Sequence, residues 1–186
     1  YVRAGAARAK VGDGPHEDQG AGGGLTGGGN VELSATPEEV WKLLLDPDTL
    51  ASVVPWCESL EQQGEDKFIA QVTIGVAGIK GTYDAEIELR DMVENTNVRL
   101  VGKASGALGF GNGEGLVSLK PLGDGRTMLS YSYQANVGGK VAAVGQRMLG
   151  TVTRLLIGQF FRGFERRLKS DGDQIGFLSR LFGRRR

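Results

Sequence analysis

The fold is decided by one stretch of sequence, Val137–Leu168, which reads V-G-G-K-V-A-A-V-G-Q-R-M-L-G-T-V-T-R-L-L-I-G-Q-F-F-R-G-F-E-R-R-L. It contains no proline, and its large apolar residues recur at intervals of three or four. The main series is Leu149, Val152, Leu156, Phe160 and Phe164, which Val141, Val144, Met148 and Leu155 widen. This spacing predicts one long helix with a wide apolar stripe. Such a stripe has to be covered by a large layer, and the strand-rich region before it is the candidate.

The composition of the chain predicts one globular domain with loose ends. The chain has 186 residues, 40% of them hydrophobic, and its 22 basic and 22 acidic residues cancel. A balanced charge gives no argument for nucleic-acid binding. The single cysteine, Cys57, excludes a disulfide framework within the chain and a cysteine-based metal cluster. No apolar run reaches the length that a membrane span needs.

Residues 1–29 are rich in glycine and almost free of large apolar side chains after Val11. This composition is typical of disorder, so we expect a linker or the remnant of a preceding domain. A fusion linker, a processed end and native disorder all agree with a start at Tyr1. The only histidine, His16, lies in this segment, and we interpret it as a solvated linker residue.

The folded region begins near Asn30 with a short strand, Val31–Leu33. Ser34–Glu39 then has the features of a helix start, with hydroxyl groups, a proline and two acids. Asp46 ends this helix and caps a second one. Val54–Glu58 is a turn that leads into a first strand. Alternating apolar residues then predict further strands at Lys67–Val76, Ile79–Arg90, Val98–Ser105, Gly109–Leu119 and Arg126–Val137. The fold class is therefore α+β, with about six antiparallel strands between two short helices and one long helix.

One of these strands has glycine at every second position. Gly109, Gly111, Gly113 and Gly115 point to one face, which Val117 and Leu119 continue. Apolar neighbours predict that this face is turned toward the long helix. Four missing side chains leave either an internal cavity or room for strong sheet curvature and close approach of the helix. The spacing alone does not separate these two alternatives.

Several of these pieces resemble CoxG, a family of carbon monoxide dehydrogenase subunits within the START-like (SRPBCC) superfamily. The resemblance covers about residues 30–168. Its most specific motifs are V-G-G-K at 137–140, G-Q-R at 145–147 and Phe160-Phe161. The similar segment V-E-L-S-A-T-P-E-E-V-W-K-L-L-L-D-P precedes these motifs in the sequence. Pro55-Trp56-Cys57-Glu58 is similar to a family element that usually has glycine in place of Trp56.

The resemblance implies a helix-grip fold, in which a curved antiparallel sheet wraps around the long C-terminal helix and encloses an apolar cavity. We expect this domain to span residues 30–169. The expected ligand-binding residues are Phe68, Val72, Tyr83, Phe110, Tyr131, Tyr133, Met148, Val152, Leu155 and Leu156. The expected pocket mouth consists of Val54, Pro55 and Trp56.

The residue inventory gives no candidate for catalysis or for a metal site. The region after residue 29 contains no histidine, so Cys57 has no histidine partner and no histidine base is available. Asp84, Glu86 and Glu88 alternate with the apolar residues of their strand and belong to a solvated face. We therefore expect no catalytic residues, no metal ligands and no enzymatic activity.

Residues 170–186 form a basic, amphipathic tail after an expected helix stop at Asp171-Gly172-Asp173. Its apolar and basic residues are typical of a short helix that lies on a membrane surface. The expected membrane-binding residues are Ile175, Phe177, Leu178, Arg180, Leu181, Phe182, Arg184, Arg185 and Arg186. Docking onto a partner protein and a disordered solubilising end remain alternatives.

The family resemblance implies an accessory role beside an aerobic molybdenum carbon monoxide dehydrogenase or a related molybdenum hydroxylase. An apolar cavity and a membrane-seeking tail together suggest a protein that carries an isoprenoid quinone, such as menaquinone, without a covalent cofactor. We expect it to be cytoplasmic and peripherally bound to the inner face of the cell membrane. A recruitment factor without ligand transport and a maturation factor for the partner's metal cofactor are the alternatives.

Overall fold

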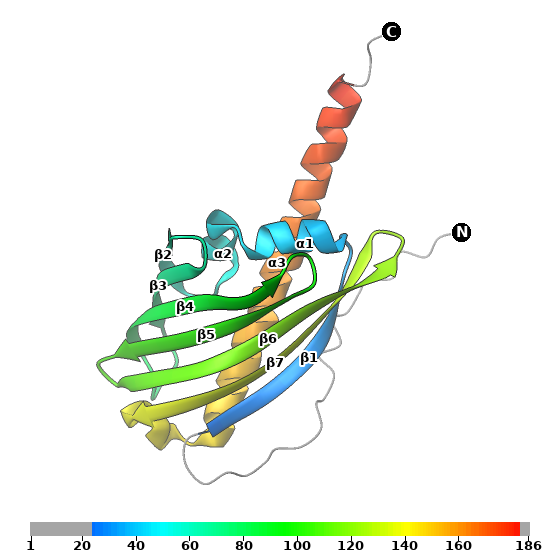
Figure 1. Cartoon of the computed structure of the whole chain (residues 1–186). Coiled ribbons are helices and arrows are strands. Elements are labelled where there is room, and N and C mark those ends of the chain that lie inside the picture. Colours follow the sequence, from blue (N-terminus) through cyan, green and yellow to red (C-terminus); the bar gives the residue numbers. More distant parts are fainter. Residues whose placement is uncertain (1–23, 183–186) are drawn as a thin grey trace.

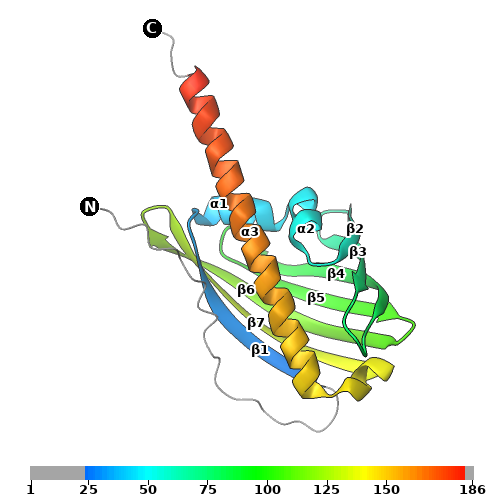
Figure 2. The same ribbon diagram turned by 180° about the vertical axis from the view of Figure 1, so that it is seen from behind.

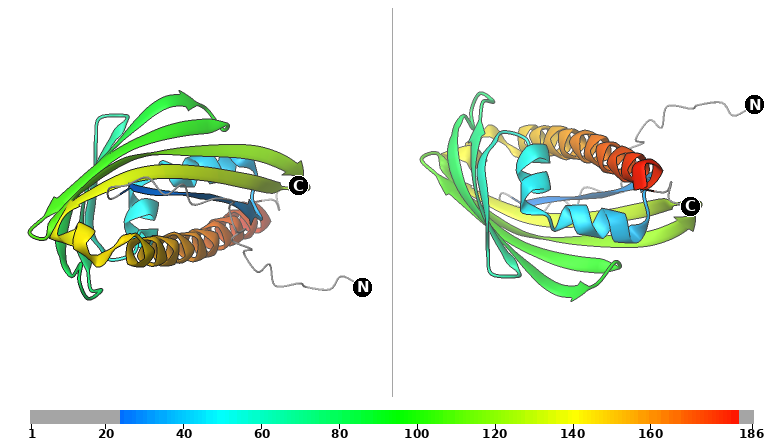
Figure 3. Two further views of the ribbon diagram at one scale, coloured as in Figure 1. Left: turned by 90° about the horizontal axis from the view of Figure 1, so that it is seen from below. Right: turned by 90° about the horizontal axis from the view of Figure 1, so that it is seen from above.

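Seven antiparallel strands form one curved sheet in residues 24–182, the part of the chain that the computed structural model describes, with side chains as far as Gln174. The strand order is β1-β7-β6-β5-β4-β3-β2. The strands are β1 (Gly24–Leu33), β2 (Cys57–Gln63), β3 (Lys67–Ile74), β4 (Gly81–Val93), β5 (Asn97–Gly106), β6 (Gly109–Gly123) and β7 (Arg126–Gly139). Figure 3 shows that the sheet bends around the long helix α3 (Gln146–Phe182). The predicted α+β helix-grip architecture is confirmed.

The two short helices, α1 (Pro37–Leu44) and α2 (Pro47–Val53), close one end of the curved sheet (Figure 1). Thr36 starts α1 with a capping box: its hydroxyl accepts from the Glu39 amide, and the Glu39 carboxylate accepts from the Thr36 amide. Asp46 starts α2, and its carboxylate accepts bonds from both the amide and the hydroxyl of Thr49. The sequence predicts both helix starts from these same residues.

Helix α3 lies across the concave side of the sheet, and its outer side is uncovered (Figure 2). The predicted stripe is confirmed, since Leu149, Val152 and Phe164 are buried and Leu156 and Phe160 are half-buried. Two predictions about its ends are wrong. Residues 137–139 complete β7, and a separate 3-10 helix, η1 (Lys140–Val144), precedes Gln146. The helix also continues through Asp171–Asp173 to Phe182 instead of stopping there.

Strand β1 begins at Gly24, six residues before the expected start of the folded region. Residues 24–29 therefore belong to the sheet, and only residues 1–23 of the expected linker, with His16, lie outside the described part. The reason is cross-strand packing: Gly27 pairs with Tyr133 and Gly29 pairs with Tyr131. A Cβ atom at either glycine would collide with the ring of its partner, so the glycines make room for the tyrosine rings.

The glycines of β6 face the concave side, as predicted from Val117 and Leu119. Val117 packs against the main hydrophobic core and Leu119 is buried, whereas the even-numbered Phe110 and Leu116 are exposed. The structure thus turns Gly109, Gly111, Gly113 and Gly115 toward the helix layer.

Candidate functional site

The middle of the concave face is built from small residues contributed by neighbouring strands. Strand pairing aligns Ala135, Gly113 and Gly102 in one row across β7, β6 and β5. The next row consists of Val137, Gly111, Ala104, Ala85 and Ala70. The glycines and alanines of both rows have short or no side chains, so the surface of the sheet is lower here than at its two ends. We call the space in front of these two rows the central hollow.

Helix α3 does not pack against the central hollow at Gly102 or at Gly111. A Cβ atom added at Gly111 would have only β7 atoms within 4 Å, and one added at Gly102 would have only β4 atoms. At Gly102 these atoms, the Glu86 carbonyl oxygen and Ile87 Cγ1, lie at an ordinary packing distance of 3.8 Å. Close approach of the helix, one of the two alternatives for the β6 glycines, is therefore wrong at Gly111.

Ile87 shows that the central hollow is open to solvent. Its side chain lies on the concave face, in the row of Phe68 and Gly102, and yet it is 38% exposed. Tyr83 and Leu89, on the same face of β4, are only 8% and 6% exposed. An apolar side chain on an inner face is normally covered. The exposure of Ile87 therefore marks an open apolar surface between the sheet and α3.

Two separate hydrophobic clusters lie on either side of the central hollow. The large cluster joins α1, the ends of β1 and β7 and the later turns of α3, around Leu33, Leu129 and Phe164. The small cluster joins the start of α3 to η1 and the β3–β4 turn, and its buried members are Ile79, Tyr83, Val141, Leu149 and Val152. The core is thus divided into two parts, and the rows of small residues separate them.

The expected ligand-binding residues fall into three groups. Phe68, Tyr83 and Val152 are buried within the two clusters. Val72, Tyr131, Tyr133 and Leu156 are half-buried on the concave side. Phe110, Met148 and Leu155 are exposed, and the expected inward placement of Phe110 is corrected.

The correction of Phe110 follows from strand geometry. Phe110 is the even-numbered neighbour of two inward-facing glycines, so its side chain is on the convex face, where it covers Gly138. Met148 and Leu155 are two helical turns apart on α3 and are exposed to a similar degree as Ile87. Residues of the floor such as Gly102 and Ala104 were not predicted, because only strand register reveals that they align with Gly111 and Gly113.

The concave face carries three tyrosines, and the hydroxyls of Tyr131 and Tyr133 lie above Gly29 and Gly27 of the edge strand β1. Tyr83 donates a hydrogen bond of 2.7 Å to the Ile79 carbonyl oxygen. The ring of Tyr131 packs against Phe161 with 5.5 Å between centroids. Burial raises the pKa of Tyr133, an effect that Arg154 partly opposes, and burial also raises the pKa of Tyr131. Both phenols are therefore protonated donors at neutral pH, and within the described residues neither hydroxyl forms a hydrogen bond.

A pocket of about 400 Å³ opens between the α2–β2 loop and α3. Val54, Pro55 and Trp56, expected at the mouth of the sheet–helix cavity, line this pocket, which contains no residue of the two rows of the central hollow. Its other lining residues are Ala51, Ser52, Val53, Cys57, Gln159, Arg162, Gly163 and Arg166. Trp56 has a positive φ of 58°, so it adopts the left-handed backbone conformation that favours glycine. The loop therefore keeps a glycine-type bend although tryptophan occupies the position.

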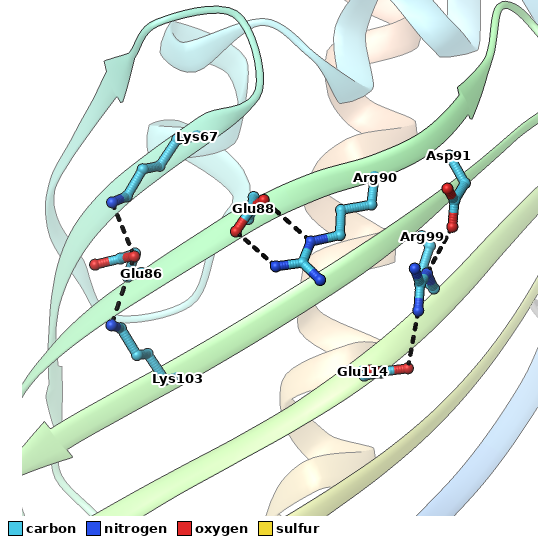
Figure 4. A network of polar contacts seen from close by, with 8 residues as sticks. All are labelled: Lys67, Glu86, Glu88, Arg90, Asp91, Arg99, Lys103 and Glu114. Carbon is cyan, nitrogen blue, oxygen red and sulfur yellow. Dashed lines mark hydrogen bonds and ion pairs between the residues drawn. The ribbon is translucent and has the colours of Figure 1, made fainter.

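The acidic residues of β4–β6 lie on the convex face, as expected for a solvated surface. Figure 4 shows that most are in ion pairs: Glu86 bridges Lys67 and Lys103, Glu88 pairs with Arg90, and Arg99 joins Asp91 to Glu114. The bond from Lys67 lowers the pKa of Glu86. Among the described residues no group of histidine, cysteine and acidic side chains is arranged to hold a metal ion.

The tail residues predicted to bind a membrane, Ile175 to Arg186, lie beyond the described side chains. The backbone of α3 is helical as far as Phe182, and Arg184–Arg186 lie outside the described residues. No helix in residues 24–182 combines the length and the apolar character that crossing a bilayer requires.

The comparison with protein families identifies this architecture. The sequence model of the CoxG family of carbon monoxide dehydrogenase subunits matches residues 29–169. The chain belongs to the CoxG family. This match confirms the resemblance drawn from the V-G-G-K, G-Q-R and Phe160-Phe161 pieces. A comparison with curated protein sequences found no match.

Solved structures agree with the START-like fold. A conserved protein from Geobacillus kaustophilus is 46% identical, with a TM-score of 0.76 over 78% of this chain and 96% of that one. A START superfamily protein from Mycobacterium smegmatis is 14% identical, with a TM-score of 0.61 over 78% and 97% of the two chains. The Zhui aromatase/cyclase from Streptomyces sp. R1128 is 16% identical, with a TM-score of 0.61 over 78% and 94%. The last two show the fold alone.

Proposed function

We propose that this CoxG-family chain is a non-catalytic accessory protein of an aerobic molybdenum carbon monoxide dehydrogenase or of a related molybdenum hydroxylase. It binds an isoprenoid quinone, such as menaquinone, in the central hollow. It links the partner enzyme to the inner face of the cytoplasmic membrane, where the quinone receives the electrons of the reaction. The family name supplies the partner, and the geometry of the hollow supports the ligand.

The observation that carries the proposal is the exposed Ile87 above a floor of glycine and alanine. Open apolar surface of this kind is unfavourable in water, at roughly 25 cal/mol per Å². Its retention between two well-packed clusters is explained when a lipophilic ligand covers it. An isoprenoid chain is flexible and apolar, so it fits a shallow surface of small side chains.

Tyr131 and Tyr133 fit the polar end of a quinone. Both are half-buried on the concave side, with their hydroxyls above Gly27 and Gly29 at the β1 edge of the sheet, and within the described residues neither hydroxyl proton has an acceptor. Quinone carbonyl oxygens accept hydrogen bonds but cannot donate them, so protonated phenols are suitable partners. The carboxylates of β4–β6 lie on the opposite face of the sheet, so none of them is placed to act on a bound ligand.

A variant that fills the central hollow tests the proposal. Gly102→Leu adds a side chain beside Ile87, where a Cβ atom has ordinary contacts. We expect the variant to fold and to bind a short-chain menaquinone at least about tenfold more weakly, a loss of about 1.4 kcal/mol. Binding is measured by quenching of tryptophan fluorescence. The matched control is Ser105→Leu, which adds the same side chain to the convex face of the same strand.

Equal affinities of wild type, Gly102→Leu and Ser105→Leu would place the quinone elsewhere and contradict the proposal. A chain shortened by residues 174–186 separates the carrier from a pure membrane recruitment factor. The carrier keeps its affinity for the soluble quinone without this segment, whereas a recruitment factor shows no specific quinone binding at all. A partner enzyme that lacks molybdenum when this protein is absent would instead indicate a maturation factor.

A further inference from the structure

The pocket between the α2–β2 loop and α3 has a positive charge that nothing in its lining balances. Its only charged lining residues are Arg162 and Arg166. They are four residues apart on α3, so their side chains project from the same side of the helix. Gln159, one turn earlier, adds an amide group, and the lining contains no carboxylate.

These two arginines differ from the arginines of the sheet. Arg90, Arg99 and Arg126 each form an ion pair with a glutamate or an aspartate. Within the described residues, neither Arg162 nor Arg166 has an acidic partner within 4 Å. The bond between the two is long and weak, since Arg166 Nε donates to the Arg162 carbonyl oxygen at 3.4 Å. Both guanidinium groups therefore retain donors for an external anion.

The opposite wall of the pocket is mainly apolar and held in place. It consists of residues 51–57, in which only Ser52 and Cys57 are not purely apolar in type. The Thr73 amide donates a 3.0 Å bond to the Trp56 carbonyl oxygen, which ties the loop to β3. The Ser52 hydroxyl donates to the Thr49 carbonyl oxygen at 2.7 Å. The pocket thus has a cationic wall from a helix and an apolar wall from a fixed loop.

We propose that this pocket binds a phosphate group, and that the phosphate belongs to the headgroup of an anionic phospholipid. Two guanidinium forks can share the several oxygens of one phosphate, whereas a carboxylate offers only two oxygens. The volume of about 400 Å³ exceeds that of a bare anion and has room for the glycerol part of a headgroup. The apolar wall of the loop then meets the beginning of the acyl chains. This inference does not depend on quinone binding in the central hollow.

The test uses the full chain and two soluble probes, inorganic phosphate and a short-chain phosphatidylglycerol below its micelle concentration. The variant is Arg162→Gln with Arg166→Gln. The control is Arg147→Gln with Lys169→Gln, which removes the same charge from exposed positions of α3 outside the pocket. All three proteins keep the C-terminal arginines, so any contribution of the tail is common to them. Titration calorimetry gives the dissociation constants, and thermal melting checks that each variant folds.

We expect saturable binding of phosphatidylglycerol, weakened at least about tenfold in the pocket variant and less than about threefold in the control, because two charge-assisted contacts are lost. Short-chain phosphatidylcholine, whose headgroup carries no net charge, binds more weakly than phosphatidylglycerol. Binding of inorganic phosphate alone, lost in the pocket variant, supports the phosphate site but overturns the lipid as its source. Equal losses in both variants, or no saturable binding of either probe, overturn the proposal.

Discussion

Trp56 shows how a residue can depart from a family pattern while the backbone keeps its shape. The tryptophan stands where CoxG sequences usually have glycine, and its φ of 58° is the left-handed conformation that costs other residues roughly 1–2 kcal/mol. The bond from the Thr73 amide to the Trp56 carbonyl oxygen holds this bend. The large side chain is exposed enough to line the pocket, so it supplies an apolar surface that glycine cannot.

Single positions also explain which site residues can be predicted from the sequence. Side chains alternate between the two faces of a strand, and the neighbours of Tyr83, Tyr131 and Tyr133 are clearly polar. This alternation therefore assigns the three tyrosines to the concave face. The prediction misplaces Phe110 because its size suggests a ligand contact. Phe110 lies between the inward-facing Gly109 and Gly111 in the strand, so its own side chain points outward. Arg162 and Arg166 have the spacing of a solvated helix side, since the sequence does not show that the α2–β2 loop lies against them.

Thr127 gives a prediction at the residue scale. It is fully buried, and its hydroxyl donates a 2.7 Å hydrogen bond to the Ala35 carbonyl oxygen, which fixes the link between β1 and α1. Thr127→Val keeps the shape but leaves this carbonyl oxygen without its donor. We expect a loss of about 1–2 kcal/mol in the free energy of unfolding, measured by urea denaturation. The control Thr26→Val, on the exposed face of β1, changes stability by less than about 0.5 kcal/mol.

At the scale of elements, the sequence predicts the helix caps well and the ends of the long α3 poorly. Caps depend on a few adjacent side chains, such as Thr36 with Glu39, which the sequence displays directly. The start of α3 depends instead on β7, which pairs with β6 as far as Gly139. Gly139 and Gly145, with φ values of 78° and 88°, then separate η1 from its neighbours. Periodicity alone does not detect such a division, because Val141 and Val144 are apolar in either arrangement.

The cap of α2 predicts a specific dependence of stability on pH. The Thr49 side chain, which donates a 2.6 Å hydrogen bond, holds the pKa of Asp46 below its ordinary value. The folded state therefore binds this proton less readily than the unfolded chain does. Stability from the charged cap is present above the ordinary aspartate pKa, about 3.9, and is lost as the pH falls through the lower folded value.

Asp46→Asn removes this charge and keeps a capping side chain. At neutral pH we expect the variant to be less stable than wild type by about 0.5–1 kcal/mol, because asparagine is a good cap that cannot interact as a charge with the helix dipole. The difference in unfolding free energy should shrink to zero as the pH falls below the ordinary aspartate range. Denaturation curves between neutral and acidic pH measure it, and a gap that stays constant over this range would show that the charge of Asp46 contributes nothing.

At the scale of the whole molecule, the divided core distinguishes this protein from a domain with one continuous interior. The large cluster contains the fully buried Leu33, Leu129 and Phe164, whereas every buried member of the small cluster retains some exposure. We therefore expect the end of the molecule that contains η1 and the start of α3 to open more readily than the other end. The central hollow lies between the two clusters, so a ligand bound there would connect them.

This arrangement predicts how ligand binding changes local stability, and the prediction rests on the proposed function. Without quinone, amides near Val141 and Leu149 exchange with solvent through local opening of the small cluster, faster than amides of β1 and β7 near Leu33 and Leu129. A short-chain menaquinone at about one hundred times its dissociation constant stabilises the folded state by about 2.7 kcal/mol. Because the ligand joins the two clusters, protection should increase most in η1, the first turns of α3 and the middle of β4. Hydrogen exchange followed by mass spectrometry measures this pattern, with Gly102→Leu as the control, whose stabilisation at the same quinone concentration should be smaller by at least about 1.3 kcal/mol. A uniform increase over the whole chain, or one confined to β1 and β7, would mean that the ligand does not bridge the clusters.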